Sequence, residues 1–95
     1  MKMKVVHVEG QNKGDIMLYA ISTCAWCKKT KKFLKSLGAE YRYVDVDLLD
    51  RDEKKKIDTE VMRWNPDRNF PMMVINNKKC IVGYKEDEIK EALHL

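Results

Sequence analysis

A continuous apolar run from Ile16 to Ala20 leads directly into a segment with helical spacing, and this junction predicts a strand followed by a helix. The run is too short for a typical helix and is apolar throughout, as expected of a central strand that is buried on both faces. The later positions repeat at helical spacing as far as Leu37, and Gly38 is placed to end the helix. The β-rich segment from Glu40 to Asp47 follows closely enough to be the returning strand of a βαβ unit.

The middle of the chain predicts a second helix and then a hairpin. Asp50 and Glu53 have the spacing of a capping box, with Asp in place of Ser or Thr, and the helix that they begin should end before Pro66. The segment from Phe70 to Ile75 is expected to form a strand whose proline is confined to its first residues, and a turn then leads to a strand at Cys80 to Val82.

Two further elements are expected at the ends of the chain. The acidic residues Glu86 to Glu88 fall in the first turn of a last helix, where they complement the positive end of the helix dipole. Met3 to Val8 partly alternates and should form a short strand at an edge. Without that extra N-terminal strand the order is βαβαββα, so we predict an α/β fold with a central mixed four-stranded sheet flanked by helices. At 95 residues, the chain 1–95 is expected to form a single domain.

Composition and charge narrow the function classes. No apolar stretch approaches the roughly 18 residues needed to span a bilayer, and the segment that begins at Met1 is unlike a signal-peptide core, so we expect no membrane partner. The net charge of +4 includes the basic run from Lys28 to Lys32, which is interpreted first as the solvated face of a helix. Because no aromatic stacking platform is interleaved with it, nucleic-acid binding is the weaker interpretation. Steering of an acidic protein partner is a third.

Cys24 and Cys27 are separated by two residues at the predicted junction of strand and helix. Unpaired backbone N–H groups in the first helical turn stabilise a thiolate at this position, so Cys24 is the predicted nucleophile. Cys27, deeper in that turn, is expected to attack a mixed disulfide at Cys24 and to release the reduced substrate. Three cysteines do not fit a disulfide-stapled secreted scaffold, and we therefore expect a reducing compartment, the cytoplasm.

A structural metal site is the alternative interpretation of the cysteine pair. Such a site normally needs four ligands, and the chain adds only Cys80, His7 and His94, without the paired spacing of zinc or iron–sulfur sites. We therefore predict no metal ligands. Cys80 itself, in a predicted strand, is expected to be a small buried hydrophobic residue, with regulatory oxidation as the alternative.

Three segments of the chain carry a family resemblance. They are Leu18 to Ala20 leading into Thr23 to Cys27, the pair Phe70–Pro71 at the start of a strand, and Val82 to Tyr84 before the acidic helix start. Together they resemble the glutaredoxins, and more narrowly the glutaredoxin-like redoxins of the NrdH type that reduce ribonucleotide reductase. The resemblance spans nearly the whole chain and implies a thioredoxin-like fold with Pro71 in cis. It also implies a dithiol thiol–disulfide oxidoreductase, an electron carrier that reduces protein disulfides.

The resemblance further implies a substrate groove beside the cysteine pair. The backbone of Phe70, next to Pro71, would pair with an extended substrate or with glutathione, as in strand addition. Gly83 and Tyr84 would shape the groove, although a tyrosine at a strand end with a solvated hydroxyl is an equal alternative for Tyr84. Trp26 would shield the cysteine pair and contact partners, its alternative being packing at the helix edge.

Several positions depart from the family pattern and bear on the electron donor. Ala25 replaces a proline common inside the motif, and Trp26 replaces a tyrosine. Ile21 stands where glutaredoxins often have a lysine that contacts glutathione, and Val82 replaces one glycine of a pair. The segment Lys85 to Asp87 differs from the serine/aspartate segment that holds the γ-glutamyl end of glutathione.

We therefore expect no tightly bound cofactor, and an electron source that is either glutathione or a protein disulfide reductase. The expected partner is a disulfide-containing protein, such as ribonucleotide reductase, and the chain itself is expected to be a monomer. The rival hypothesis is a non-catalytic iron–sulfur cluster binding or assembly protein on the same fold, in which Cys24 ligates a cluster together with external thiols.

Overall fold

The strands and helices form where the apolar patterns place them. The structure, a computed structural model, describes residues 5–95. The strands are β1 (Val5–Val8), β2 (Ile16–Ala20), β3 (Tyr41–Asp45), β4 (Met72–Ile75) and β5 (Lys79–Val82). The helices are α1 (Ala25–Ser36), α2 (Arg51–Trp64) and α3 (Glu86–Ala92), with a short 3-10 turn at Val46–Leu48. Met3 and Lys4, the first residues of the predicted N-terminal strand, lie outside the described residues.

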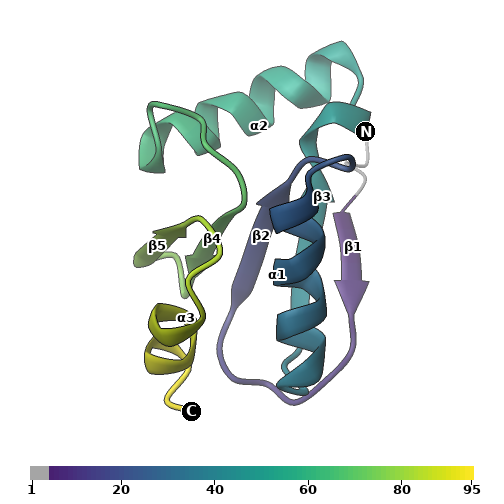
Figure 1. Cartoon of the computed structure of the whole chain (residues 1–95). Helices are drawn as coiled ribbons and strands as arrows, with labels where there is room; N and C mark the ends of the chain where they lie inside the picture. The colour runs from purple at the N-terminus through teal and green to yellow at the C-terminus, as the bar shows by residue number, and fades with distance from the viewer. Residues whose placement is uncertain (1–4) are drawn as a thin grey trace.

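The described strands form one mixed sheet in the order β1-β3-β2-β4-β5 (Figure 1). The βαβ unit is confirmed, because β2 and β3 are parallel, with Leu18 opposite Tyr43. All other pairs are antiparallel, and β4 and β5 form the predicted hairpin. The order βαβαββα with an extra N-terminal strand is therefore confirmed, and that strand lies at an edge of the sheet, as predicted.

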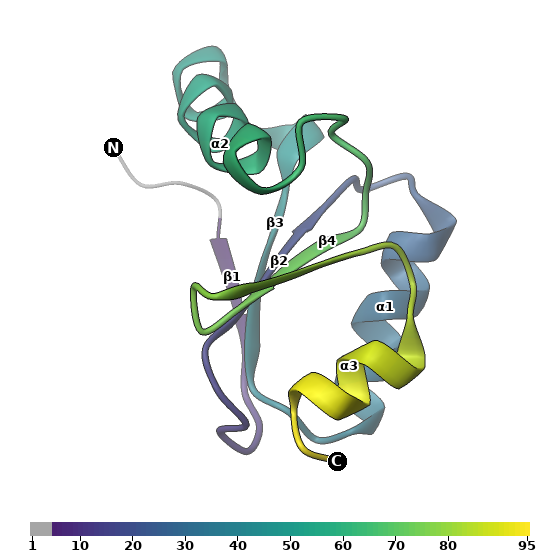
Figure 2. The ribbon, with the colours of Figure 1, turned by 90° about the vertical axis from the view of Figure 1, so that its left-hand side faces the viewer.

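Helices cover both faces of the sheet. α1 and α3 lie on one face and α2 lies on the other, as the turned view shows (Figure 2). Side chains of β2 alternate between the two faces, so that Leu18 belongs to the core beneath α1 and α3, whereas Tyr19 belongs to the core beneath α2. Both of these side chains are buried, which confirms the prediction that β2 is a central strand buried on both faces.

Local signals at the helix ends act as the sequence predicts. The Asp50 side chain accepts a hydrogen bond from the backbone N–H of Glu53, and the Glu53 carboxylate accepts one from the backbone N–H of Asp50. This capping box begins α2, which ends at Trp64, before Pro66. Gly38, just past the end of α1, has a φ of +69°, in the left-handed region that favours glycine.

Two predicted strands are shorter in the structure. β3 ends at Asp45 rather than Asp47, because the next three residues form the 3-10 turn. β4 begins at Met72 rather than Phe70, and the peptide bond between Phe70 and Pro71 is cis, as the resemblance implied. Within residues 5–95, the helices are all too short or too polar to cross a lipid bilayer.

Candidate active site

The site lies at the amino end of α1, just after the short segment that connects β2 to this helix. Cys24 is the N-cap residue, with extended backbone angles, and its sulfur accepts a hydrogen bond of 3.2 Å from the backbone N–H of Cys27. The backbone N–H of Cys24 donates to the carbonyl of Ile21 at 3.0 Å, which fixes the turn before the helix. The sulfur of Cys24 therefore lies over the open N–H groups of the first turn, where a helix stabilises negative charge.

The two cysteines differ in environment. Cys24 is half-buried, whereas Cys27 is fully buried in the core between the sheet and α1. Burial raises the pKa of the Cys27 thiol to about 12, and its hydrogen bond with Cys24 adds to that rise. Cys27 is thus a neutral thiol at physiological pH, whereas the sulfur exposed to a partner is that of Cys24. A partner can therefore reach the sulfur of Cys24, whereas the sulfur of Cys27 is shielded from solvent.

A half-buried ion pair lies on the same helix, one turn beyond Cys27. The Nζ atom of Lys31 is 2.9 Å from a carboxylate oxygen of Asp45, at the end of β3, and 4.1 Å from the centre of the Tyr43 ring. The positive charge of Lys31 lowers the pKa of Cys27, against the larger effect of burial. The ion pair therefore joins α1 to the end of β3, one helical turn after Cys27.

The structure brings together all five residues that were predicted to form the groove. Trp26, Phe70, Pro71, Gly83 and Tyr84 line one cavity of about 260 Å³. The backbone N–H of Gly83 donates to the carbonyl of Pro71 at 2.8 Å, which ties the segment after β5 to the segment before β4. Gly83 has a φ of +95°, a conformation that side chains rarely adopt.

Aromatic rings form a continuous strip beside this groove. Tyr84 contacts Trp26, with 5.9 Å between ring centres, and meets Phe33 edge-on at the same distance. Trp26 is 56 % exposed, and the Nζ atom of Lys29 lies 4.6 Å above its ring. The Tyr84 hydroxyl donates to the Glu86 carboxylate at 2.7 Å, so both interpretations of Tyr84 apply: the ring lines the groove and its hydroxyl is at the surface.

Ser22 and Asp47 hold the segment before Cys24, and our sequence reasoning missed this pair. The backbone N–H of Ser22 donates to Asp47 at 2.8 Å, and its hydroxyl donates to the other oxygen of the same carboxylate. These hydrogen bonds hold the pKa of Asp47 below its usual range. No local sequence signal links the two residues, because they come together only through the parallel pairing of β2 and β3, in which Ala20 is opposite Asp45.

The loop before Pro71 also contains residues that were missed. Asn65 is buried and donates from its side-chain amide to the carbonyl of Asn69 at 2.7 Å, which shapes the chain ahead of Phe70. Arg68 lines a second cavity of about 260 Å³ together with Lys54, Ile21 and Phe70. Cationic groups therefore lie near Ile21, although that position itself is apolar. The sequence around Arg68, in a loop, and around Lys54, on α2, does not indicate that the two side chains line one cavity.

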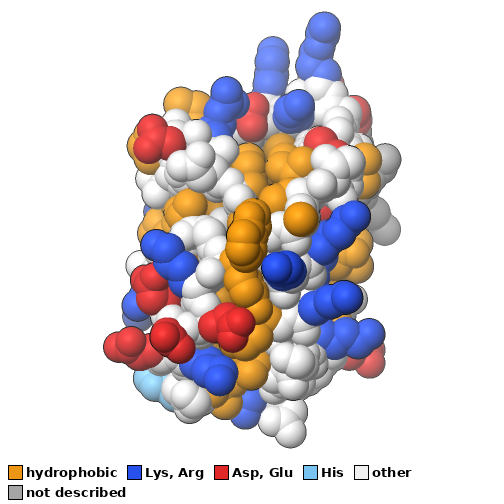
Figure 3. Space-filling view, in the orientation of Figure 1, with side chains coloured by type: hydrophobic (Ala, Val, Ile, Leu, Met, Phe, Trp, Pro, Cys, Tyr) orange, Lys and Arg blue, Asp and Glu red, His pale blue; other side chains and the backbone are white. Residues whose placement is uncertain are grey.

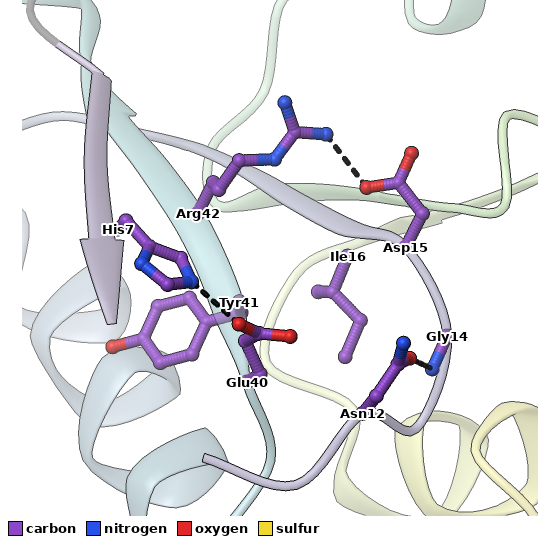
Figure 4. Close-up of a pocket in the computed structure, with 8 residues that line it drawn as sticks. All are labelled: His7, Asn12, Gly14, Asp15, Ile16, Glu40, Tyr41 and Arg42. Carbon is purple, nitrogen blue, oxygen red and sulfur yellow. Dashed lines mark hydrogen bonds and ion pairs between the residues drawn. The ribbon is translucent and has the colours of Figure 1, made fainter. Parts of the chain in front are cut away.

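A separate polar cavity of about 280 Å³ lies at the other end of β2 and β3 (Figure 4). Two polar contacts line it: a hydrogen bond of 2.7 Å between His7 and Glu40, and an ion pair of 2.6 Å between Arg42 and Asp15. The first joins β1 to the start of β3, and the second joins β3 to the chain before β2. The cavity includes none of the predicted site residues, so it lies apart from the cysteine chemistry.

Cys80 lies across the sheet from the cysteine pair. It is half-buried on β5 and packs against the core beneath α2, whereas Cys27 belongs to the core beneath α1 and α3. Burial raises the pKa of Cys80 as well. Within the part of the chain that the structure describes, no three His, Cys, Asp or Glu side chains are grouped so as to hold a metal ion.

Comparison with known proteins points to one family. The family model for glutaredoxin matches residues 16–81, which include the cysteine pair and the segment around Pro71. A glutaredoxin-like 8.6 kDa protein from the rubredoxin operon of Clostridium pasteurianum is 32 % identical over 78 residues, covering 82 % of this chain and 96 % of that protein.

Solved structures of known proteins point to the same family. The glutaredoxin from Methanosarcina mazei Go1 superposes with a TM-score of 0.91 at 47 % identity, covering 99 % of this chain and 91 % of the other. The methanoredoxin of Methanosarcina acetivorans gives a TM-score of 0.87 at 49 % identity, covering 90 % of each chain. The superposition on the Methanosarcina mazei glutaredoxin covers the extra N-terminal strand β1 as well.

Proposed function

Because this chain belongs to the glutaredoxin family, whose members are thiol–disulfide oxidoreductases, we propose that it reduces disulfides of protein substrates by a dithiol mechanism. One observation carries the proposal: the sulfur of Cys24 caps α1 at a half-exposed position, while Cys27 is buried behind it as a neutral thiol. A thiolate is the attacking form, and a helix amino end favours it.

The reaction runs in two exchanges. The Cys24 thiolate attacks one sulfur of the substrate disulfide, a mixed disulfide forms, and the other substrate sulfur leaves as a thiolate that takes a proton. Cys27 then loses its proton and attacks the sulfur of Cys24, which releases the second substrate thiol. The enzyme is left with a disulfide between Cys24 and Cys27, and two electrons have passed to the substrate.

The groove holds the substrate next to Cys24. An extended substrate segment lies against Phe70 and Pro71 and pairs with the backbone of Phe70, in the manner of strand addition. Gly83 leaves room for that backbone because it carries no side chain, and the rings of Trp26 and Tyr84 supply apolar contact area. An amphipathic aromatic surface of this kind suits a protein partner.

The reductant returns the enzyme to its dithiol form. Glutathione is the reductant of glutaredoxins and is not a tightly bound cofactor, and a protein disulfide reductase is the other electron source that we consider. Among protein substrates, ribonucleotide reductase is the one that the NrdH-type resemblance suggests. The proposal includes a monomer that works in the cytoplasm, where the reducing environment keeps such pairs reduced.

The test is reduction of insulin disulfides by the purified chain with dithiothreitol as the electron source. Cys24→Ser should abolish the activity, whereas the matched control Cys80→Ser should keep it, because Cys80 lies across the sheet. Activity that persists in Cys24→Ser, or that depends on Cys80, would refute the proposal. The rates at which glutathione and a protein disulfide reductase reduce the oxidised enzyme then identify the physiological class of reductant.

A further inference from the structure

The turn that connects β2 to α1 makes backbone contacts to both cysteines. It runs from Ile21 to Cys24 and is closed by the hydrogen bond of 3.0 Å from the backbone N–H of Cys24 to the carbonyl of Ile21. The backbone of Ile21 also bonds the sulfur of Cys27, which lowers the pKa of that thiol against the larger effect of burial. The geometry of this one turn therefore bears on both sulfurs.

A single carboxylate ties this turn to the end of β3. The backbone N–H of Ser22 donates to one oxygen of Asp47 at 2.8 Å, and the Ser22 hydroxyl donates to the other oxygen. These two bonds form the Ser22–Asp47 clamp. Because both carboxylate oxygens are engaged by one residue, the clamp fixes the orientation of Ser22 as well as its distance. Hydrogen bonds to an ionised acceptor are stronger than those between neutral groups. Asp47 is ionised at physiological pH, since these bonds hold its pKa below its usual range.

Asp47 belongs to a well-packed part of the chain. It lies in the 3-10 turn Val46–Leu48, and both Val46 and Leu49 are buried in the core beneath α2. Because β2 and β3 are parallel, the turns that follow them emerge at the same end of the sheet (Figure 1). The clamp therefore ties the turn before Cys24 to the packed end of β3.

Neither stability nor charge explains the clamp. Asp47 is exposed, and the contacts of exposed charged groups contribute little to the free energy of unfolding. Its charge is also unfavourable for the chemistry: Ser22 lies two positions before Cys24, and a negative charge nearby disfavours a thiolate. The contribution that remains for Asp47 is to fix the geometry of the turn.

The apolar surface beside the cysteine pair does not supply this geometry. Figure 3 shows a hydrophobic band down the face that carries α1 and α3, and the rings of Trp26 and Tyr84 contact each other on this side. Hydrophobic contact is non-directional, so such a surface can hold a substrate without fixing the sulfur that attacks it. Yet a misplacement of about 1 Å can cost roughly 100-fold in rate.

From these contacts we infer that Asp47 is a positioning residue for the disulfide exchange: through Ser22 it holds the turn that keeps the Cys24 sulfur over the backbone N–H of Cys27. The contact that the clamp preserves is the hydrogen bond of 3.2 Å from that N–H to the Cys24 sulfur. The inference rests on the proposed function and adds to it a residue from the other end of the βαβ unit.

The test measures how fast the pre-reduced protein reduces a synthetic disulfide-bonded peptide, whose cysteines are flanked by uncharged residues, at pH 7. Asp47→Ala removes both bonds of the clamp and should lower the second-order rate constant about tenfold. Asp47→Asn keeps both bonds, because the amide oxygen accepts from the Ser22 N–H and the amide N–H donates to the Ser22 hydroxyl. Its rate constant should stay within about twofold of the wild type.

A double-mutant cycle separates the clamp from other effects. Ser22→Ala removes the hydroxyl bond and keeps the backbone bond, so it should lower the rate constant about threefold. Ser22→Ala/Asp47→Ala should be no slower than Asp47→Ala, because the hydroxyl has already lost its partner. The matched control Asp52→Ala removes the same charge from an exposed position in the first turn of α2, and should leave the rate constant within about twofold.

Urea unfolding then distinguishes positioning from stability. Asp47→Ala and Asp47→Asn should have similar urea midpoints, because the clamp is exposed, while their rate constants differ about fivefold. If Asp47→Ala fails to fold, Ser22→Ala and Asp47→Asn decide the inference, and an unchanged rate constant in Ser22→Ala would overturn it.

The other outcomes are equally decisive. A rate constant for Asp47→Ala at or above that of the wild type would overturn the inference, because removal of a negative charge alone predicts that result. A rate constant for Asp47→Asn as low as that of Asp47→Ala would also overturn it, as would a further threefold loss in the double variant. Failure of the wild type to reduce the peptide would instead count against the proposed function.

Discussion

Cys27 should resist alkylation far more strongly than an ordinary cysteine. Its pKa of about 12 lies five units above neutrality, so the thiolate is roughly one part in 10⁵ at pH 7. A thiol with the ordinary pKa of 9.0 is about one part in 100 ionised at the same pH, about a thousandfold more. Because only the thiolate reacts, the alkylation rate should differ by at least that factor, and full burial slows it further.

The assay follows iodoacetamide labelling of Cys27 by mass spectrometry in the variant Cys24→Ser/Cys80→Ser, which leaves it as the single thiol. That variant removes the hydrogen bond with Cys24 but keeps burial, the larger cause of the shift, so the rate should still rise tenfold per pH unit beyond pH 9. The same variant in guanidinium chloride is the control and should level off near pH 9. A plateau at or below pH 9 in the folded protein would refute the reasoning.

Three further predictions concern stability. Folding raises the pKa of Cys27, so its neutral form contributes stability that is present below pH 9 and is lost as the pH rises toward 12. The difference in urea midpoint between the wild type and Cys27→Ser should therefore shrink above pH 9. Leu34 is fully buried between α1 and the sheet, so Leu34→Ala should lower the free energy of unfolding by about 2–5 kcal/mol. The control Lys35→Ala, at the exposed neighbouring position, should change it by less than about 0.5 kcal/mol. Equal effects of the two variants in urea titrations would contradict the packing. Glu53→Ala removes one partner of the capping box and should cost about 1 kcal/mol, and an unchanged thermal midpoint would show that the box contributes nothing.

Most of the fold could be predicted because its signals are local. The apolar run of β2, the helical repeat of α1 and the capping box at Asp50 each depend on residues within one or two turns of each other. The boundaries were less accurate where the backbone leaves regular geometry without a strong residue signal. The 3-10 turn after Asp45 is such a place, because Val46 continues the apolar pattern of β3 into the core beneath α2.

That the five residues assigned to the groove lie together could be predicted from the sequence, because they belong to segments that carry the family resemblance. The contacts that hold them could not, because they join residues far apart in the chain. Ser22 meets Asp47 only because β2 and β3 end side by side, and Arg68 reaches Asp58 only because the loop after α2 folds back on that helix. The basic run of α1 was visible in the sequence, but the aromatic strip depends on Tyr84, in the segment after β5, packing against Trp26 and Phe33 of α1.

The central claim is that Cys24 attacks and Cys27 resolves, and trapping of the mixed disulfide tests it most directly. The variant Cys27→Ser/Cys80→Ser is mixed with a synthetic disulfide-bonded peptide, whose cysteines are flanked by uncharged residues, at pH 7, and the adduct is mapped by mass spectrometry. We predict a stable adduct on Cys24, no adduct in Cys24→Ser/Cys80→Ser, and in the wild type only the disulfide between Cys24 and Cys27. An adduct on Cys27 in the variant that lacks Cys24, or no adduct on Cys24, would contradict the account.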